Sequence, residues 1–112
     1  MQVSMLGTHK TAVIEKGFST EVIYHETPVV QFNGEFIALN TGGWFTATTK
    51  RRMNQASVEF ELGYEVFQRE KKWFVSFKHR VYFYQEGLLL ERHTGRAFVH
   101  ASDLSLLEVG AI

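Results

Sequence analysis

The residues best suited to chemistry stand together in one short stretch. It holds, in order, a glycine pair, two aromatic residues, three threonines and three cations. These are Gly42, Gly43, Trp44, Phe45, Thr46, Thr48, Thr49, Lys50, Arg51 and Arg52. Backbone N–H groups at a helix start, hydroxyl groups and cations are together the groups that bind phosphate. The same cations could instead pair with acids of the same fold, such as Glu35 or Glu65. The stretch therefore predicts either an anion site or a structural charge cluster.

The two aromatic residues beside the glycine pair also have two interpretations. Trp44 and Phe45 could stack on the bases of a single-stranded nucleic acid. They could equally anchor the following helix to a sheet as core residues. A second group of cations lies in a predicted hairpin and the strand after it. The candidate binding residues, for an anion or a partner surface, are Trp44, Thr48, Thr49, Lys50, Arg51, Arg52, Arg69, Lys71, Lys72 and Arg80.

Charge is balanced over the whole chain but not along it. The formal net charge is zero, so charge alone indicates neither a nucleic-acid nor a membrane partner. Residues 50–80 carry eight basic side chains against four acidic ones, a net of +4. Residues 1–49 and 81–112 each carry two against four, a net of −2. The basic middle is either neutralised by the two acidic ends within one fold or available to an anionic partner.

The sequence contains no recognisable catalytic, metal-binding or cofactor-binding pattern. Cysteine is absent, which removes thiolate nucleophiles, disulfides and zinc–thiolate sites together. The five histidines have no metal-ligand spacing, and there is no nucleophile elbow and no dinucleotide or phosphate loop. The carboxylates are scattered, so a catalytic dyad is not indicated. We therefore predict no catalytic residues, no metal, no cofactor and no enzymatic activity.

Targeting signals are equally absent from the sequence. No apolar run approaches about 18 residues, so no transmembrane helix is predicted. The first ten residues have no apolar core of signal-peptide length. The expected location is therefore the cytoplasm, which would be that of the host cell if the protein is encoded by a phage.

Length and composition predict a single folded domain over residues 1–112. Hydrophobic residues make up 45% and aromatic residues 14% of the chain, which excludes general disorder and favours strands. Residues 1–9 lack a clear period and are expected to form a loose N-terminus. Residues 97–112 are a less determined C-terminal extension. A strand is expected over 96–100, followed by a short helical turn capped by Ser102 or Asp103.

One helix is predicted from about residue 48 to residue 62. Met53, Ala56 and Phe60 recur at helical spacing and would pack on one face of a sheet. Thr48 or Thr49 is the expected N-cap. Gly63 is the expected C′ glycine that ends the helix. On this interpretation Lys50, Arg51 and Arg52 fall in the first turn, where cations oppose the helix dipole.

The remainder reads as an antiparallel sheet of five to seven strands, which with the helix defines an α+β fold. Asn33-Gly34, between two apolar-rich runs, predicts a hairpin with a type I′ turn. After the helix a meander of strands is expected from Tyr64 to Arg92, with a charged turn at 69–72. Within it Trp73, Val75 and Phe77 should share one face.

One family resemblance rests on two runs of sequence, LNTGGWFTATTKRRMNQ and GYEVFQREKKWFVSF. Together they resemble a small domain of unknown function found in bacteriophage and prophage proteins. In that family a strand leads to a Gly-Gly-Trp turn, a Thr-Thr-Lys-x-Arg-Met-Asn helix and a tyrosine-rich hairpin with a tryptophan. The resemblance covers roughly residues 27–90. It implies phage origin and a small α+β architecture, and it brings no activity with it.

Two functional classes follow from the residues and the resemblance together. The first is a non-enzymatic phage protein that binds a host or defence protein or nucleoprotein complex, for example an anti-CRISPR type of inhibitor. The second is a nucleic-acid-binding accessory protein that uses the basic helix start and the hairpin. Pull-down with and without nuclease would separate the two classes. An open sheet edge would also permit a homodimer.

Overall fold

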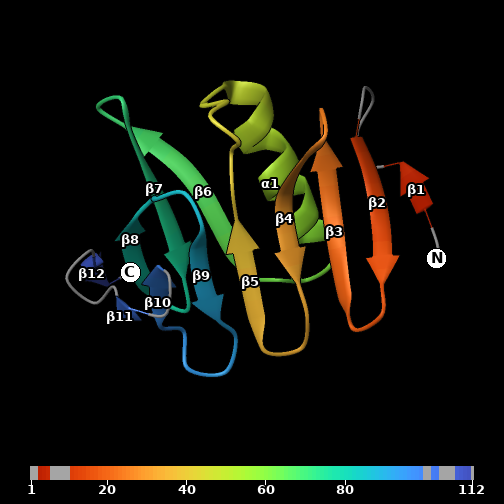
Figure 1. Ribbon diagram of the computed structural model, residues 1–112. Helices are drawn as coiled ribbons and strands as arrows, with labels where there is room; N and C mark the ends of the chain where they lie inside the picture. Colours follow the sequence, from red (N-terminus) through yellow and green to blue (C-terminus); the bar gives the residue numbers. More distant parts are fainter. Residues whose placement is uncertain (1–2, 6–10, 100–101, 104–107, 112) are drawn as a thin grey trace.

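The fold is α+β and mostly sheet, as the sequence predicts. The computed structural model describes residues 3–5, 11–99, 102–103 and 108–111. In this part of the chain, one helix and twelve strands are present (Figure 1). Their bounds are β1 Val3–Met5, β2 Thr11–Lys16, β3 Ser19–Tyr24, β4 Thr27–Phe32, β5 Phe36–Leu39, α1 Ala47–Glu59, β6 Tyr64–Arg69, β7 Lys72–Phe77, β8 Arg80–Phe83, β9 Leu88–Glu91, β10 Ala97–Val99, β11 Ser102–Asp103 and β12 Glu108–Ala111.

The strands divide between two antiparallel sheets, where the sequence predicts a single sheet of five to seven strands. The large sheet has the order β1-β2-β3-β4-β5-β9-β10-β11, and the small sheet has the order β12-β8-β7-β6. The division arises after β8, because β9 does not continue the meander. It crosses instead to pair with β5, with Leu88 opposite Leu39 and Leu90 opposite Ile37 (Figure 1).

Helix α1 joins the two sheets through one core. It lies against β6 of the small sheet and against β3 and β4 of the large sheet. Met53 and Ala56 are fully buried, and Phe60 packs on Phe32 with ring centroids 5.1 Å apart, as their spacing predicts. The core side chains come from both sheets and from the helix. They are Val13, Val22, Val29, Val30, Ile37, Leu39, Met53, Ala56, Leu62, Tyr64, Val66, Val75, Phe77, Tyr82, Tyr84, Leu88, Leu90 and Ala97.

The ends of α1 differ from the predicted ones. The N-cap is Thr46, whose hydroxyl accepts a hydrogen bond from the Thr49 amide at 3.2 Å. At the other end the Leu62 amide donates to the Ser57 carbonyl at 2.8 Å, and the Glu61 amide donates to the Val58 carbonyl at 3.3 Å. This is a Schellman pattern with Glu61 at C′, where φ is +55°. The prediction of Gly63 at C′ was wrong because the helix ends one turn earlier.

Two-residue hairpin turns with positive φ occur, but not at the predicted dipeptide. Asn33-Gly34 does form a hairpin connection, in which the Asn33 side chain accepts from the amides of Glu35 and Phe36 at 2.8 Å. Neither Asn33 nor Gly34 has positive φ, so the predicted type I′ turn is wrong. Both central residues have positive φ instead in three other hairpins. These pairs are His25 and Glu26, Glu70 and Lys71, and Lys78 and His79.

Both chain ends add strands that the sequence did not predict. Val3–Met5 pairs with β2 at the edge of the large sheet, within the segment expected to be a loose N-terminus. Ser102–Asp103 pairs with β10, where a helical cap was expected. Residues 104–107, the rest of that predicted helical turn, lie outside the described residues. Glu108–Ala111 pairs with β8 in the small sheet.

Candidate functional site

The loop that leads from β5 into helix α1 is held by hydrogen bonds to one carboxylate. Glu86 accepts hydrogen bonds from the Thr41 amide at 2.9 Å, the Thr41 hydroxyl at 2.7 Å and the Gly43 amide at 3.3 Å. The Tyr84 hydroxyl also donates to it, at 2.5 Å. A Cβ atom on Gly42 would lie 2.6 Å from the Thr27 hydroxyl oxygen, so the loop passes too close to β4 for a side chain there. No local pattern in the chain indicates the bonds from Thr41 and Gly43 to Glu86, because they join residues more than 40 positions apart.

The hydrogen bonds to Glu86 also control its ionisation. Burial by itself would raise its pKa, but the bonds from Tyr84, Thr41 and Gly43 outweigh burial, and the net pKa is lowered. Burial raises the pKa of the Tyr84 hydroxyl, and the neighbouring carboxylate raises it further. Glu86 is therefore a carboxylate, and Tyr84 a neutral donor, at neutral pH.

This loop presents two aromatic rings to solvent. Trp44 is 58% and Phe45 is 52% exposed. Phe45 contacts Trp73 edge-on with ring centroids 5.2 Å apart, and it contacts Tyr84 at 5.9 Å. Lys50 lies with its ammonium group 5.4 Å from the centre of the Trp73 ring. We call the residues Trp44, Phe45, Thr48, Lys50 and Trp73 the Trp44 surface.

Trp44 also lines a pocket of about 350 Å³. Its walls come from the β3–β4 turn, the loop and the helix start. They are Tyr24, His25, Trp44, Thr46 and Thr48. Trp44 therefore lines this pocket, while its neighbour Phe45 contacts Trp73.

The start of helix α1 does not have the arrangement predicted for an anion site. Two backbone amides there already have acceptors, because Thr46 N donates to the Trp44 carbonyl and Thr49 N donates to the Thr46 hydroxyl. Thr49 is itself buried. Since α1 begins at Ala47, Lys50 stands at the end of the first turn, and the two arginines follow in the second.

The three consecutive cations of α1 point to three different sides. Lys50 turns toward the small sheet, where its ammonium group donates to the Gln68 side chain at 3.1 Å. Arg51 is exposed on the outer face of the helix. Arg52 is only 5% exposed, and its guanidinium donates to the Thr11 hydroxyl and to the Gln55 side chain, both at 3.0 Å. The helix period thus distributes these charges and assigns Arg52 to packing against the large sheet.

The remaining candidate cations lie at opposite ends of the small sheet. Arg69, Lys71 and Lys72 are exposed at the tip of the β6–β7 hairpin. Arg80 is opposite Phe77, at the β7–β8 turn, and therefore belongs to the other end of β7. The structure brings Trp44, Thr48 and Lys50 together and separates Arg80 from them.

Side chains of α1 close the free edge of strand β6. The Asn54 amide group donates to the Val66 carbonyl at 2.8 Å and accepts from the Val66 amide at 2.7 Å. Ser57 does the same for Tyr64, donating to its carbonyl at 2.6 Å and accepting from its amide at 3.0 Å. The helix therefore stands where a further strand would otherwise pair.

A row of phenyl rings crosses the outer face of the small sheet. Phe67, Phe74 and Phe83 lie directly opposite one another on β6, β7 and β8. Their ring centroids are 5.5 and 5.2 Å apart. Arg69 extends the row, with its guanidinium 5.8 Å from the Phe67 ring. The alternation of the meander could have indicated this row, since Tyr82 and Tyr84 face the core.

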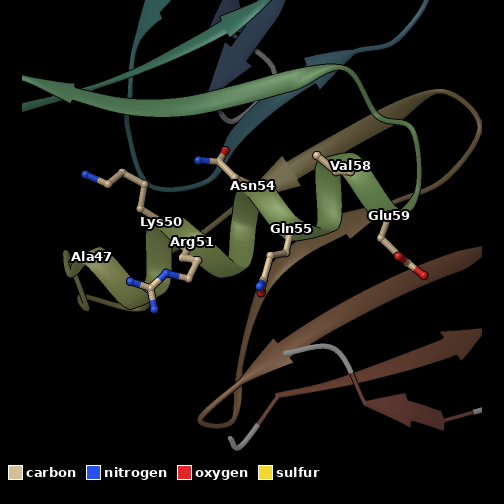
Figure 2. A pocket seen from close by; sticks show the side chains of 7 residues that line it. All are labelled: Ala47, Lys50, Arg51, Asn54, Gln55, Val58 and Glu59. Atoms are coloured by element: carbon tan, nitrogen blue, oxygen red, sulfur yellow. The ribbon is translucent and has the colours of Figure 1, made fainter. Parts of the chain in front are cut away.

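The outer face of α1 carries a shallow hollow that is wide open to solvent. The hollow measures about 730 Å³, and all its described lining residues belong to the helix (Figure 2). They are Ala47, Lys50, Arg51, Asn54, Gln55, Val58 and Glu59. Val58 is 80% exposed in this hollow.

The described residues contain no cluster of three or more His, Asp or Glu side chains placed to hold a metal ion. In the same residues, no helix is long and apolar enough to cross a membrane.

The fold and the Trp44 surface define a small α+β protein with an exposed aromatic loop at the start of its helix. The chain belongs to the Kyanoviridae Gp96 protein family, whose model matches residues 3–98. This is a phage protein family, which confirms the phage type of the domain that the sequence resemblance implied. The match extends beyond the 27–90 range of that resemblance and includes β1. Comparison with curated proteins and with solved structures gives no match.

Proposed function

We propose that this phage-type protein acts by binding, without catalysis, to a protein or nucleoprotein complex of the host or its defences. Inhibition of a defence complex, as by an anti-CRISPR protein, is the form of activity we favour, and the host cytoplasm is the place. The single observation that supports this proposal is the Trp44 surface. Two exposed aromatic rings are held on a loop that Glu86 fixes from behind.

Rigid exposed aromatic residues are the usual energetic centres of protein interfaces. Tryptophan supplies a large apolar area with few rotatable bonds, so little conformational entropy is lost when a partner covers it. Here the loop is already ordered by Glu86, and Lys50 lies beside the rings. The surface fits a partner with an apolar pocket and acidic groups at its rim.

A pull-down from host lysate tests this proposal. We expect tagged wild-type protein to capture a protein partner that resists nuclease treatment, and Trp44→Ala to lose most of that capture. Phe18→Ala is the matched control. Phe18 is 99% exposed at the β2–β3 turn, the opposite end of β3 from Tyr24 and the pocket beside Trp44. Undiminished capture by Trp44→Ala would contradict the proposal.

The phenyl row favours a second candidate function, the binding of single-stranded nucleic acid. Aromatic rings beside cations are the combination that sequence-tolerant single-strand binders use. Phe67, Phe74 and Phe83 provide the rings, and Arg69 and Lys72 provide cations on the same face.

Anisotropy of a labelled oligonucleotide tests the second candidate. Binding should weaken with salt, with a log–log slope of about −0.7 for each phosphate contacted, and Phe74→Ala should reduce it. Capture of a partner that disappears on nuclease treatment would support this function over the first. Binding unaffected by Phe74→Ala would exclude the phenyl row as its site.

A further inference from the structure

The charges of α1 are arranged against its own dipole. The first turn contains no acidic residue, and the last turn contains no basic one. Arg51 stands in the N-terminal half, and Glu59 is the last helical residue. A helix N-terminus is partially positive and a C-terminus partially negative, so each of these two charges is on the less favourable half.

The exposed charges also lack partners on their own helix. Arg51, Gln55 and Glu59 follow one another at spacing four and lie along one side of the helix (Figure 2). A neutral glutamine therefore occupies the position where each charge would find an i±4 partner. Among the described residues neither Arg51 nor Glu59 forms an ion pair.

We propose that this face binds a second copy of the same chain, with the two α1 helices antiparallel. A two-fold axis at Gln55 makes the stripe self-complementary. Arg51 of each copy then faces Glu59 of the other, and the two Gln55 side chains, which can both donate and accept, meet on the axis. The spacing of Arg51 and Glu59 on either side of Gln55 is equal, about 6 Å along the helix axis.

The antiparallel arrangement also removes the conflict with the dipole. Each Arg51 approaches the partially negative C-terminus of the other helix, and each Glu59 approaches the partially positive N-terminus. The hollow of about 730 Å³ along this face provides room for the side chains of the second copy. Val58, which is 80% exposed beside the stripe, loses solvent exposure in this arrangement. One helix pair is small beside a standard interface, so the dimer should exchange rapidly with the monomer.

Sedimentation velocity over a concentration series tests the dimer. Wild type should self-associate, and less so at high salt, because the ion pairs are exposed. In a dimer of Arg51→Glu the two contacts would contain four acidic side chains. In a dimer of Glu59→Arg they would contain four basic ones. Each single variant should raise the dimer Kd by at least about tenfold. Arg69→Glu, the same charge change at the β6–β7 tip, should leave self-association unchanged.

Mixing the two single variants provides the decisive measurement. Arg51→Glu of one chain is complementary to Glu59→Arg of the other at both contacts, so an equimolar mixture should form a heterodimer with restored affinity. The double variant Arg51→Glu/Glu59→Arg should likewise self-associate as wild type does. A wild type that stays monomeric, or a mixture that does not associate, would overturn the proposal and leave this face to a different partner.

Discussion

At the scale of single residues, Glu86 accepts four hydrogen bonds and so holds the loop that carries Trp44. One carboxylate holds two backbone amides and two hydroxyl groups that belong to the loop and to the β8–β9 connection. Hydrogen bonds to a charged acceptor are stronger than those to a neutral one. The orientation of the Trp44 surface therefore depends on a residue 42 positions away from Trp44 in sequence.

Replacing Glu86 by glutamine should lower stability and loosen the loop. We expect a loss of about 1–3 kcal/mol in the free energy of unfolding, because an amide accepts fewer and weaker hydrogen bonds. Urea denaturation measures this loss. Glu65→Gln is the matched control, since Glu65 is exposed on β6, and it should change stability little. If both variants lose the same amount, the bonds to Glu86 do not stabilise the loop.

The same variant should remove part of the acid sensitivity of the protein. The folded-state pKa of Glu86 is lowered from its ordinary value of 4.5. A lowered pKa adds stability above pH 4.5, and that stability is lost as the pH falls through the folded-state pKa. The difference in stability between wild type and Glu86→Gln should therefore be constant above about pH 5.5 and shrink below pH 4.5. A difference that stays constant at lower pH would contradict this assignment.

At the scale of elements, helix α1 covers the edge of strand β6 that has no neighbouring strand. Asn54 and Ser57 satisfy the carbonyl and amide groups of Val66 and Tyr64 that point away from β7. Buried backbone groups without partners are costly, so these two side chains complete the small sheet at this edge.

Asn54→Ala should therefore destabilise the protein and expose the edge. Leaving the Val66 amide and carbonyl unpaired should cost about 1–3 kcal/mol. Hydrogen exchange of the Val66 amide should become faster than in wild type, while that of Val75 in β7 should change only with global stability. Unchanged exchange at Val66 would show that water or another group replaces Asn54.

The β6–β7 turn places two non-glycine residues in the left-handed region. Glu70 and Lys71 have φ of +53° and +66°. A non-glycine residue in this region is strained by about 1 kcal/mol. Glycine removes that strain but gives the unfolded chain more conformational entropy, which offsets part of the gain in stability. Lys71→Gly should raise the free energy of unfolding by about 0.5 kcal/mol in thermal or urea denaturation. Lys72→Gly, one residue on in β7, should lower it, because glycine weakens a strand.

At the scale of the whole molecule, two sheets and one helix share a single core. Met53 lies fully buried between β6 on one side and β3 and β4 on the other. Since the buried side chains of both sheets form one core cluster, the two sheets should unfold together.

Truncating Met53 to alanine tests this cooperativity. The cavity should cost about 2–5 kcal/mol. Tryptophan fluorescence, which reports on Trp44 and Trp73, and far-UV circular dichroism should shift by the same amount and keep coincident midpoints. Val58→Ala on the exposed side of the same helix is the control and should change stability little. Separate midpoints for the two probes would show that the small sheet unfolds independently.

Local pattern determined the elements of this protein. The helical spacing of Met53, Ala56 and Phe60 placed the helix. The apolar runs around Asn33-Gly34 and the alternation after the helix placed strands β4 to β9 and the common face of Trp73, Val75 and Phe77. These features depend on residues a few positions apart, whose periodicity is visible in the chain itself. The resemblance to a small phage domain also came from the chain alone, and the family match supports it.

Tertiary structure alone decided how those elements meet. The crossing of β9 to β5, the burial of Arg52, the carboxylate of Glu86 behind the loop and the sealing of β6 by Asn54 all join residues at least 12 positions apart. No period constrains such contacts, because they depend on the rotation and translation of one packed element against another. The sequence therefore shows Lys50, Arg51 and Arg52 as consecutive cations. Only the packing of α1 against the two sheets decides which surroundings each of them meets.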